Sequence, residues 1–181
     1  LSLQPDDALG VGIDLARLGA LAPEEALTDG YVRALFDEYA PRFDRHLVDS
    51  LSYRAPELLR DAVLRAAQGR STAFRFARVL DLGCGTGLVA RAFAGLCETI
   101  AGVDLSPEML AGAERTGLYA RLHEGDILAF LRGEASGSAD LVVAADVFVY
   151  VARLEPLLAE AARVLRRRGL LAFTVQAHGG G

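Results

Sequence analysis

Apolar residues in the first part of the chain recur every three or four positions, the spacing that places side chains on one face of a helix. The pattern predicts one helix within residues 5–20 that ends before Pro23, and three short helices that begin near Thr28, Pro41 and Pro56. Because proline is tolerated in the first turn of a helix but not in its interior, the two later prolines each indicate a new start. On the last of these helices the predicted buried positions are Leu58, Leu59, Ala62, Val63 and Ala66.

From residue 76 onward, short apolar runs alternate with further helical patterns. Strands are predicted over 78–82, 99–104, 119–123, 140–145 and 170–175. The helices between them are predicted over 88–96, 107–116, 127–132 and 154–167. This alternation is typical of an α/β fold with a mainly parallel, doubly wound sheet that carries helices on both faces. Three arginines are interpreted as the last turn of the final helix, where cations suit the macrodipole: Arg166, Arg167 and Arg168.

Three glycines at alternate positions, Gly83, Gly85 and Gly87, join the first predicted strand to the helix after it. Glycine adopts φ above zero and lets a ligand approach the main chain closely, so this turn is a candidate contact site. A dinucleotide fingerprint, G-x-G-x-x-G, needs glycine where this chain has Leu88, and a Walker A loop needs a lysine, which the chain lacks. A plain strand-to-helix connection is the remaining alternative, but Asp81 inside the strand argues against it.

Acidic residues also stand at the ends of three later strands. Asp104 ends the second, Glu124 and Asp126 follow the third, and Asp146 follows the fourth. Ligands of open parallel sheets bind beyond the carboxyl ends of the strands, and an acid at the end of the second strand can accept hydrogen bonds from ribose hydroxyls. One such acid is often only a helix cap, but acids at successive strand ends indicate a binding site.

Composition narrows the class of protein. The chain has 181 residues, of which 52% are hydrophobic, so it can form one domain with a sizeable core. Its net charge of −5 gives no general attraction to nucleic acid or to an anionic membrane, and no apolar run is long enough to span a bilayer. Two cysteines form no disulfide framework and fit a reducing compartment, so we interpret the protein as cytoplasmic. No metal site is predicted.

The phrase from Val79 to Gly87, V-L-D-L-G-C-G-T-G, resembles the first motif of class I S-adenosylmethionine-dependent methyltransferases, and the resemblance extends from Arg78 to Val175. It implies a Rossmann-like sheet in the methyltransferase strand order, S-adenosylmethionine as the cofactor, and a small-molecule or protein methyl acceptor. Methyl transfer from a sulfonium is an in-line displacement in which the protein mainly positions the reactants. No catalytic residue is assigned; the groups that could deprotonate an acceptor are Tyr39, His46, Asp146 and Tyr150.

The implied cofactor contacts follow the carboxyl ends of the predicted strands. The methionine portion would lie on the Gly-rich turn, formed by Asp81, Gly83, Cys84 and Gly85. The ribose would bind to Asp104, and the adenine would lie between Leu105 and Met109. The adenine amino edge and the floor near the sulfonium would be formed by Asp126, Ile127, Ala145 and Asp146.

The helical segment before the sheet carries a second resemblance. The spacing F-D-x-Y-A-x-x-F-D-x-H-L, followed by Y-R-x-P, is similar to that of bacterial methyltransferases with tetratricopeptide repeats, of which residues 1–26 would be the end of the repeat array. Residues 28–69 would form a lid over a core of 76–176. Tyr39, Tyr53 and Arg54 would join the cofactor site, where the Arg54 guanidinium suits the methionine carboxylate. Ordinary core packing is the alternative for the aromatic residues.

The chain departs from the methyltransferase pattern after the last predicted strand, where the family usually adds a helix and an antiparallel hairpin. Without those strands, residues 170–175 would form a bare apolar edge, so we expect either a longer natural chain or association through that edge. A cofactor-binding module with little catalysis, which recruits a partner through upstream repeats, is the alternative function. A Rossmann dehydrogenase is disfavoured by Leu88.

Overall fold

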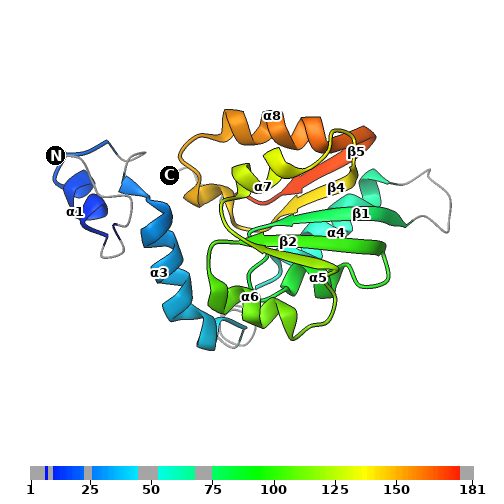
Figure 1. Ribbon diagram of the computed structural model, residues 1–181, viewed down its shortest axis with the longest axis horizontal. Coiled ribbons are helices and arrows are strands. Elements are labelled where there is room, and N and C mark those ends of the chain that lie inside the picture. Colours follow the sequence, from blue (N-terminus) through cyan, green and yellow to red (C-terminus); the bar gives the residue numbers. More distant parts are fainter. Residues whose placement is uncertain (1–6, 8–9, 23–25, 45–52, 68–74, 176–181) are drawn as a thin grey trace, which may run out of the picture.

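The computed structural model describes residues 7, 10–22, 26–44, 53–67 and 75–175. Its centre is one sheet in the order β3-β2-β1-β4-β5, in which every neighbouring pair of strands is parallel (Figure 1). The strands are β1 (Phe76–Leu82), β2 (Cys97–Asp104), β3 (Arg121–Glu124), β4 (Ala139–Ala144) and β5 (Leu165–Phe173). The predicted doubly wound α/β fold is therefore confirmed, and the strand order reverses between β1 and β4.

Helices cover both faces of this sheet. On one face α7 (Ile127–Gly133) and α8 (Leu154–Val164) pack on the strands, and Figure 1 shows α4 (Ala55–Ala66), α5 (Leu88–Ala92) and α6 (Pro107–Glu114) on the other. All six residues of β4 are buried, as a central strand covered on both faces requires. The carboxyl ends of β1 and β4 remain uncovered by these helices and face the N-terminal part of the chain.

The N-terminal segment forms α1 (Val11–Arg17), α3 (Asp29–Tyr39) and the 3₁₀ turn η1 (Ala40–Arg42). Thr28 caps α3, since its Oγ1 accepts a hydrogen bond from the Tyr31 N–H at 3.2 Å. The helix ends before Pro41, as predicted. The helix expected after this proline falls mostly outside the described residues, as do its predicted inward residues Leu47 and Leu51 and the candidate base His46.

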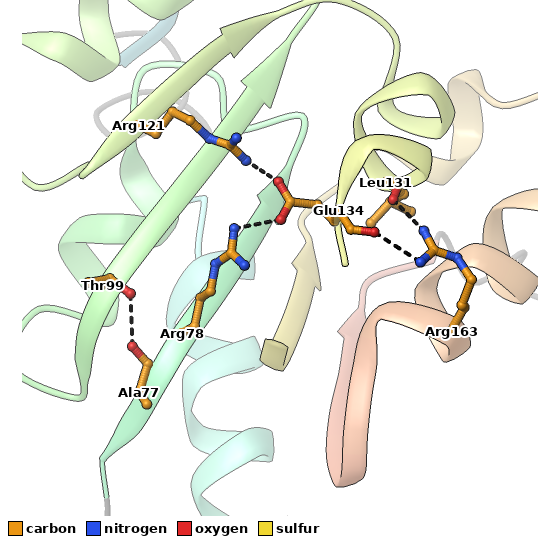
Figure 2. A network of polar contacts seen from close by, with 7 residues as sticks. All are labelled: Ala77, Arg78, Thr99, Arg121, Leu131, Glu134 and Arg163. Atoms are coloured by element: carbon orange, nitrogen blue, oxygen red, sulfur yellow. Dashed lines mark hydrogen bonds and ion pairs between the residues drawn. The ribbon is translucent and has the colours of Figure 1, made fainter. Parts of the chain in front are cut away.

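An ion-pair network joins the elements at the amino ends of the strands (Figure 2). Glu134, which follows α7, accepts hydrogen bonds from Arg78 on β1 at 2.5 Å and from Arg121 on β3. The Arg163 guanidinium on α8 donates to the backbone oxygens of Leu131 and Glu134 at 2.8 and 2.9 Å. The Glu134 side chain is only 5% exposed, so removing either guanidinium would leave a buried charge with fewer partners.

The structure corrects the prediction for the last helix. Helix α8 ends at Val164 rather than Arg167, and Arg166 to Arg168 lie at the start of β5. There Arg166 pairs with the buried carboxylate of Asp140, and Arg168 has φ of 68° within an irregularity of the β4–β5 pairing. A buried acid on the neighbouring strand thus outweighs the attraction of the helix end.

The predicted core face of α4 is narrower than expected. On α4, Leu59 and Val63 are buried, whereas Leu58 is 56% exposed and Ala62 and Ala66 are also exposed. Helix α8 has a similarly narrow buried face, with Leu157, Ala161 and Val164 buried and Leu158 37% exposed. Each helix packs on the sheet through a narrow stripe of residues, so the apolar residues beside that stripe stay at the surface.

Candidate functional site

A cavity of about 470 Å³ lies beyond the carboxyl ends of the strands, between the sheet and α3. Its size is within the range of small-molecule and cofactor sites. Most of the residues predicted from the sequence line it: Tyr39, Tyr53, Gly83, Gly85, Asp104, Leu105, Met109, Asp126, Ile127, Ala145 and Asp146. The strand topology thus brings together side chains that are more than 100 positions apart in the chain.

The Gly-rich turn has the backbone that its glycines suggested. Gly83, Gly85 and Gly87 have φ of 64°, 52° and 91°, a region that other residues rarely adopt. A Cβ on Gly83 would lie 2.5 Å from Cγ2 of Val147, so the turn also needs glycine for space. The turn is fixed to β2, because the Cys84 N–H donates to the Val103 oxygen at 2.9 Å.

Asp104 connects this turn to the end of β2. Its Oδ2 accepts from the Gly85 N–H at 2.8 Å, and its Oδ1 accepts from the Ser106 N–H at 3.0 Å. Burial raises the pKa of Asp104, and the backbone N–H groups of Ser106, Gly85 and Leu105 oppose that rise. Each carboxylate oxygen has two lone pairs, so Asp104 can hold the turn and still accept hydrogen bonds from a ligand in the cavity.

Asp81 lies beneath the turn and does not line the cavity. It is fully buried, and its Oδ2 accepts a hydrogen bond from the Tyr119 hydroxyl at 2.7 Å. Its Oδ1 has no hydrogen-bond partner among the described residues. Burial raises the pKa of Asp81 to about 7; the Tyr119 hydrogen bond lowers it and the charge of Asp104 raises it further. Cys84 is also buried below the turn, outside the cavity lining.

A second polar group lies at the end of β4. Asp146 has φ of 55°, unusual for a residue other than glycine, and its N–H donates to Oγ1 of Thr174 at 2.7 Å. The same Thr174 hydroxyl donates to Asp146 Oδ1 at 2.6 Å. Burial raises the pKa of Tyr53 well above its ordinary value, and the charge of Asp146 and a hydrogen bond to its carboxylate raise it further. Thr174, Asp146 and Tyr53 therefore form one chain of contacts at the cavity wall.

Helix α3 supplies an apolar and aromatic wall opposite the sheet. The rings of Phe36 and Tyr150 meet edge to face with centroids 5.3 Å apart, and the rings of Tyr39 and Phe43 do so at 5.2 Å. Val32 of the same helix lines the cavity with them. This apolar wall, formed by Val32, Phe36, Tyr39, Phe43 and Tyr150, suits an apolar ligand group rather than a charged one.

Polar contacts hold α3 against the edge of the sheet. The Arg33 guanidinium donates to the Leu105 oxygen and to Glu124 Oε1, both at 2.9 Å. The Ser106 hydroxyl donates to Asp37 Oδ1 at 2.5 Å. We call Arg33 and Asp37, together with their partners Leu105, Ser106 and Glu124, the α3 latch.

Several site residues depart from the sequence-based expectation. Arg54 is exposed at the N-terminal end of α4 and does not line the cavity, so the structure does not bring its guanidinium to the site. Asp126 lines the cavity, but its Oδ1 also caps α7 by accepting from the Ala129 N–H at 2.8 Å. Tyr119 and Thr174 were not predicted as site residues. For Tyr119 the sequence signal was a tyrosine in an apolar run, and for Thr174 there was none.

Two negative findings apply to the described parts of the chain. Residues 7, 10–22, 26–44, 53–67 and 75–175 contain no group of three His, Cys, Asp or Glu side chains that could hold a metal ion. Within those same ranges, each helix is too short or too polar to cross a membrane.

Comparison with known proteins identifies the family. Residues 80–173 match the family model described as "Methyltransferase domain". The chain belongs to this methyltransferase family. It is 34% identical over 146 residues to the malonyl-[acyl-carrier protein] O-methyltransferase of Enterobacter lignolyticus, a match that covers 81% of this chain and 53% of that enzyme. The chain thus spans about half the length of this relative.

Solved methyltransferase structures share the fold. A TehB-like SAM-dependent methyltransferase from Corynebacterium glutamicum aligns with a TM-score of 0.59 and 27% identity over 77% of this chain and 72% of that one. The complex of DhpI with SAH aligns with a TM-score of 0.61 and 25% identity over 77% of this chain and 65% of that one. The class I methyltransferase fold that the Gly-rich motif suggested is thereby confirmed.

Proposed function

We propose that this chain binds S-adenosylmethionine in the 470 Å³ cavity and transfers its methyl group to an acceptor that enters along the apolar wall of α3. The observation that carries the proposal is that one cavity is lined both by the Gly-rich turn with Asp104 and by that wall. A cofactor and an acceptor bound there would meet at the end of β4. The proposal extends the methyltransferase family assignment to the reaction of this chain.

The residues present fit this cofactor. Asp81 keeps a buried carboxylate oxygen without a partner among the described residues, which suits an ammonium group such as that of the methionine portion. Asp104 keeps acceptor capacity toward the cavity for the ribose hydroxyls, and Leu105 and Met109 provide apolar surface for the adenine. Tyr39, Asp126, Ile127 and Ala145 complete the proposed contacts. When bound, S-adenosylmethionine supplies a methyl group that is already activated on a sulfonium.

The protein's own contribution to methyl transfer is mainly positioning and exclusion of water. Asp146 is the group we propose to accept the proton of an oxygen or nitrogen acceptor, because it lines the cavity and is fixed by Thr174. The raised pKa of Tyr53 keeps its hydroxyl protonated, so Tyr53 acts as a hydrogen-bond donor rather than a base. We propose an oxygen acceptor on an apolar body, by analogy with the O-methyltransferases that are similar in sequence.

We propose that the protein is cytoplasmic and bacterial, and that residues 1–26 end an upstream repeat array ahead of a lid formed by 28–69. The alternative is a binding module with little catalysis, which would bind the cofactor with the same affinity. Product formation on a panel of phenol, carboxylate and amine acceptors distinguishes the two.

Isothermal titration with S-adenosylhomocysteine tests the binding step, with NAD as the competing cofactor. We expect the first to bind and the second not to bind. Asp104→Ala should weaken binding by roughly 1.5–3 kcal/mol, the scale of hydrogen bonds to a charged group. Asp14→Ala is the matched control, because the Asp14 side chain is 75% exposed on α1. Binding of NAD, or unchanged affinity in folded Asp104→Ala, would contradict the proposal.

A further inference from the structure

The Tyr119 ring reaches Asp81 by passing over a glycine on the strand between them. Gly102 of β2 is the register partner of Asp81 on β1, and a Cβ on Gly102 would lie 2.8 Å from Cε1 of Tyr119. On the other side of the ring, a Cβ on Gly87 would lie 3.2 Å from Cε2. A side chain at either position would collide with the ring, so the ring fills the space that the two glycines leave, and its hydroxyl lies 2.7 Å from Asp81 Oδ2.

The surroundings of Asp81 contain acids rather than bases. Four titratable groups interact electrostatically with the Asp81 carboxyl group. They are Tyr119 before β3, Asp104 at the end of β2, Cys84 in the turn and Tyr53 before α4. None of these four carries a positive charge. A buried carboxylate with no cationic neighbour among these groups is stabilised by hydrogen bonds alone, unless a cation binds to it.

We propose that Tyr119 is a positioning residue for the cofactor: its hydroxyl engages one carboxylate oxygen of Asp81 and thereby fixes the other, Oδ1, as the acceptor for the cofactor's ammonium group. The inference rests on the proposed function and adds to it a residue from outside the cavity lining. One oxygen bound and one free is the arrangement that the described residues display. Without the hydroxyl, the carboxyl group could rotate, and burial would favour its neutral form.

The arrangement makes cofactor binding depend on pH. An ammonium group prefers the ionised carboxylate, and burial raises the pKa of Asp81 to about 7 in the free protein. Affinity should therefore rise about tenfold between pH 6 and pH 8 and then level off. Because the Tyr119 hydrogen bond lowers this pKa, Tyr119→Phe should move the midpoint upward and weaken binding at pH 7 by about five- to tenfold.

The test is titration of S-adenosylhomocysteine into the full 181-residue chain at pH 6, 7 and 8. Tyr119→Phe keeps the ring that fills the space over Gly102 and removes only the hydroxyl. Tyr31→Phe is the matched control, since Tyr31 lies on α3 and does not line the cavity. Asp81→Asn completes a double-mutant cycle: it should flatten the pH dependence, and Tyr119→Phe should then have no further effect.

A second measurement needs no ligand. The ¹³C resonance of the Asp81 carboxyl group, assigned by comparison with Asp81→Asn, should titrate near pH 7 in the free protein and at higher pH in Tyr119→Phe. The inference is overturned if ligand binds but Tyr119→Phe matches the unmodified chain in affinity and in pH profile. It is also overturned if the carboxyl resonance does not move. Failure of S-adenosylhomocysteine to bind to the unmodified chain would instead remove the proposed function itself.

Discussion

At the scale of single residues, the buried carboxyl group of Asp81 makes the stability of the fold depend on pH. Its pKa in the folded protein is about 7, against an ordinary value of 3.8, so folding favours the protonated group. Its contribution to stability is fully present below about pH 4 and is lost as pH rises through about 7. With respect to this group, the fold is therefore least stable at the pH where the proposed ammonium ligand would bind best.

Asp81→Asn should separate these two properties. Asparagine keeps an oxygen for the Tyr119 hydroxyl and never ionises, so at pH 8 the free energy of unfolding should increase by about 2–4 kcal/mol, with almost no change at pH 4. Urea unfolding at both pH values measures the difference, with the exposed Asp14→Asn as the control. A gain of equal size at pH 4 would show that burial of the charge is not its cause.

Individual site residues differed in how far the sequence could predict them. Asp104 and Asp146 were predictable, because their places at strand ends follow from local patterns alone. Tyr119 and Thr174 were not predictable. Tyr119 binds to Asp81, 38 positions away, and Thr174 binds to Asp146, 28 positions away, and only the sheet topology brings these pairs together. Arg54 was placed in the site by a resemblance of spacing, but the start of α4 leaves it in solvent.

At the scale of elements, α3 is held to the sheet by the α3 latch and by aromatic contacts. Arg33→Ala removes two hydrogen bonds that join the helix to Leu105 and Glu124. Amide exchange over 29–39 should then become about two- to fivefold faster, the size expected from exposed pairs of 0.2–1 kcal/mol. Mass spectrometry of exchange in the free protein measures this change.

The matched control for the latch is Arg42→Ala, because the Arg42 ion pair with Glu38 stays within the N-terminal segment. It should leave exchange over 29–39 nearly unchanged. Addition of S-adenosylhomocysteine should slow exchange over 29–39 more than over 79–82, since α3 covers the cavity while β1 is already central. Equal protection of both segments would contradict a ligand-dependent lid.

The existence and type of most elements followed from periodicity, but several of their ends did not. Helix α5 stops at Ala92 and β2 begins at Cys97, so the expected longer helix was wrong by four residues. The end of the final helix was predicted three residues too late for a different reason, because Arg166 forms an ion pair with the buried Asp140 on β4. A pairing between residues of two strands cannot be read from the local pattern of either.

At the scale of the whole molecule, β5 forms one edge of the described sheet and pairs only with β4 among its strands. Phe173 and Val175 at its carboxyl end are 42% and 67% exposed. An apolar strand with an unpaired edge invites pairing with another chain. The 181-residue chain should therefore associate as its concentration rises, and Val175→Lys should reduce that association.

Sedimentation velocity over a hundredfold range of concentration would detect this association. Val11→Lys is the control, because Val11 is 48% exposed on α1, far from the β5 edge in Figure 1. A monomer at every concentration in the unmodified chain would contradict association through the edge. So would an equal effect of both lysine variants.

The two groups of ion pairs also differ in how they would respond to dissolved salt. The Arg33 and Glu124 side chains are 45% and 48% exposed, whereas the Glu134 carboxylate in Figure 2 is 5% exposed. Mobile ions screen exposed charges far more than buried ones. Raising the ionic strength should thus weaken the ion pair that holds α3 to the sheet, while the buried ion pairs at the amino ends of the strands persist. Ionic strength therefore acts on the helix that covers the cavity and spares the buried contacts that join the amino ends of the strands.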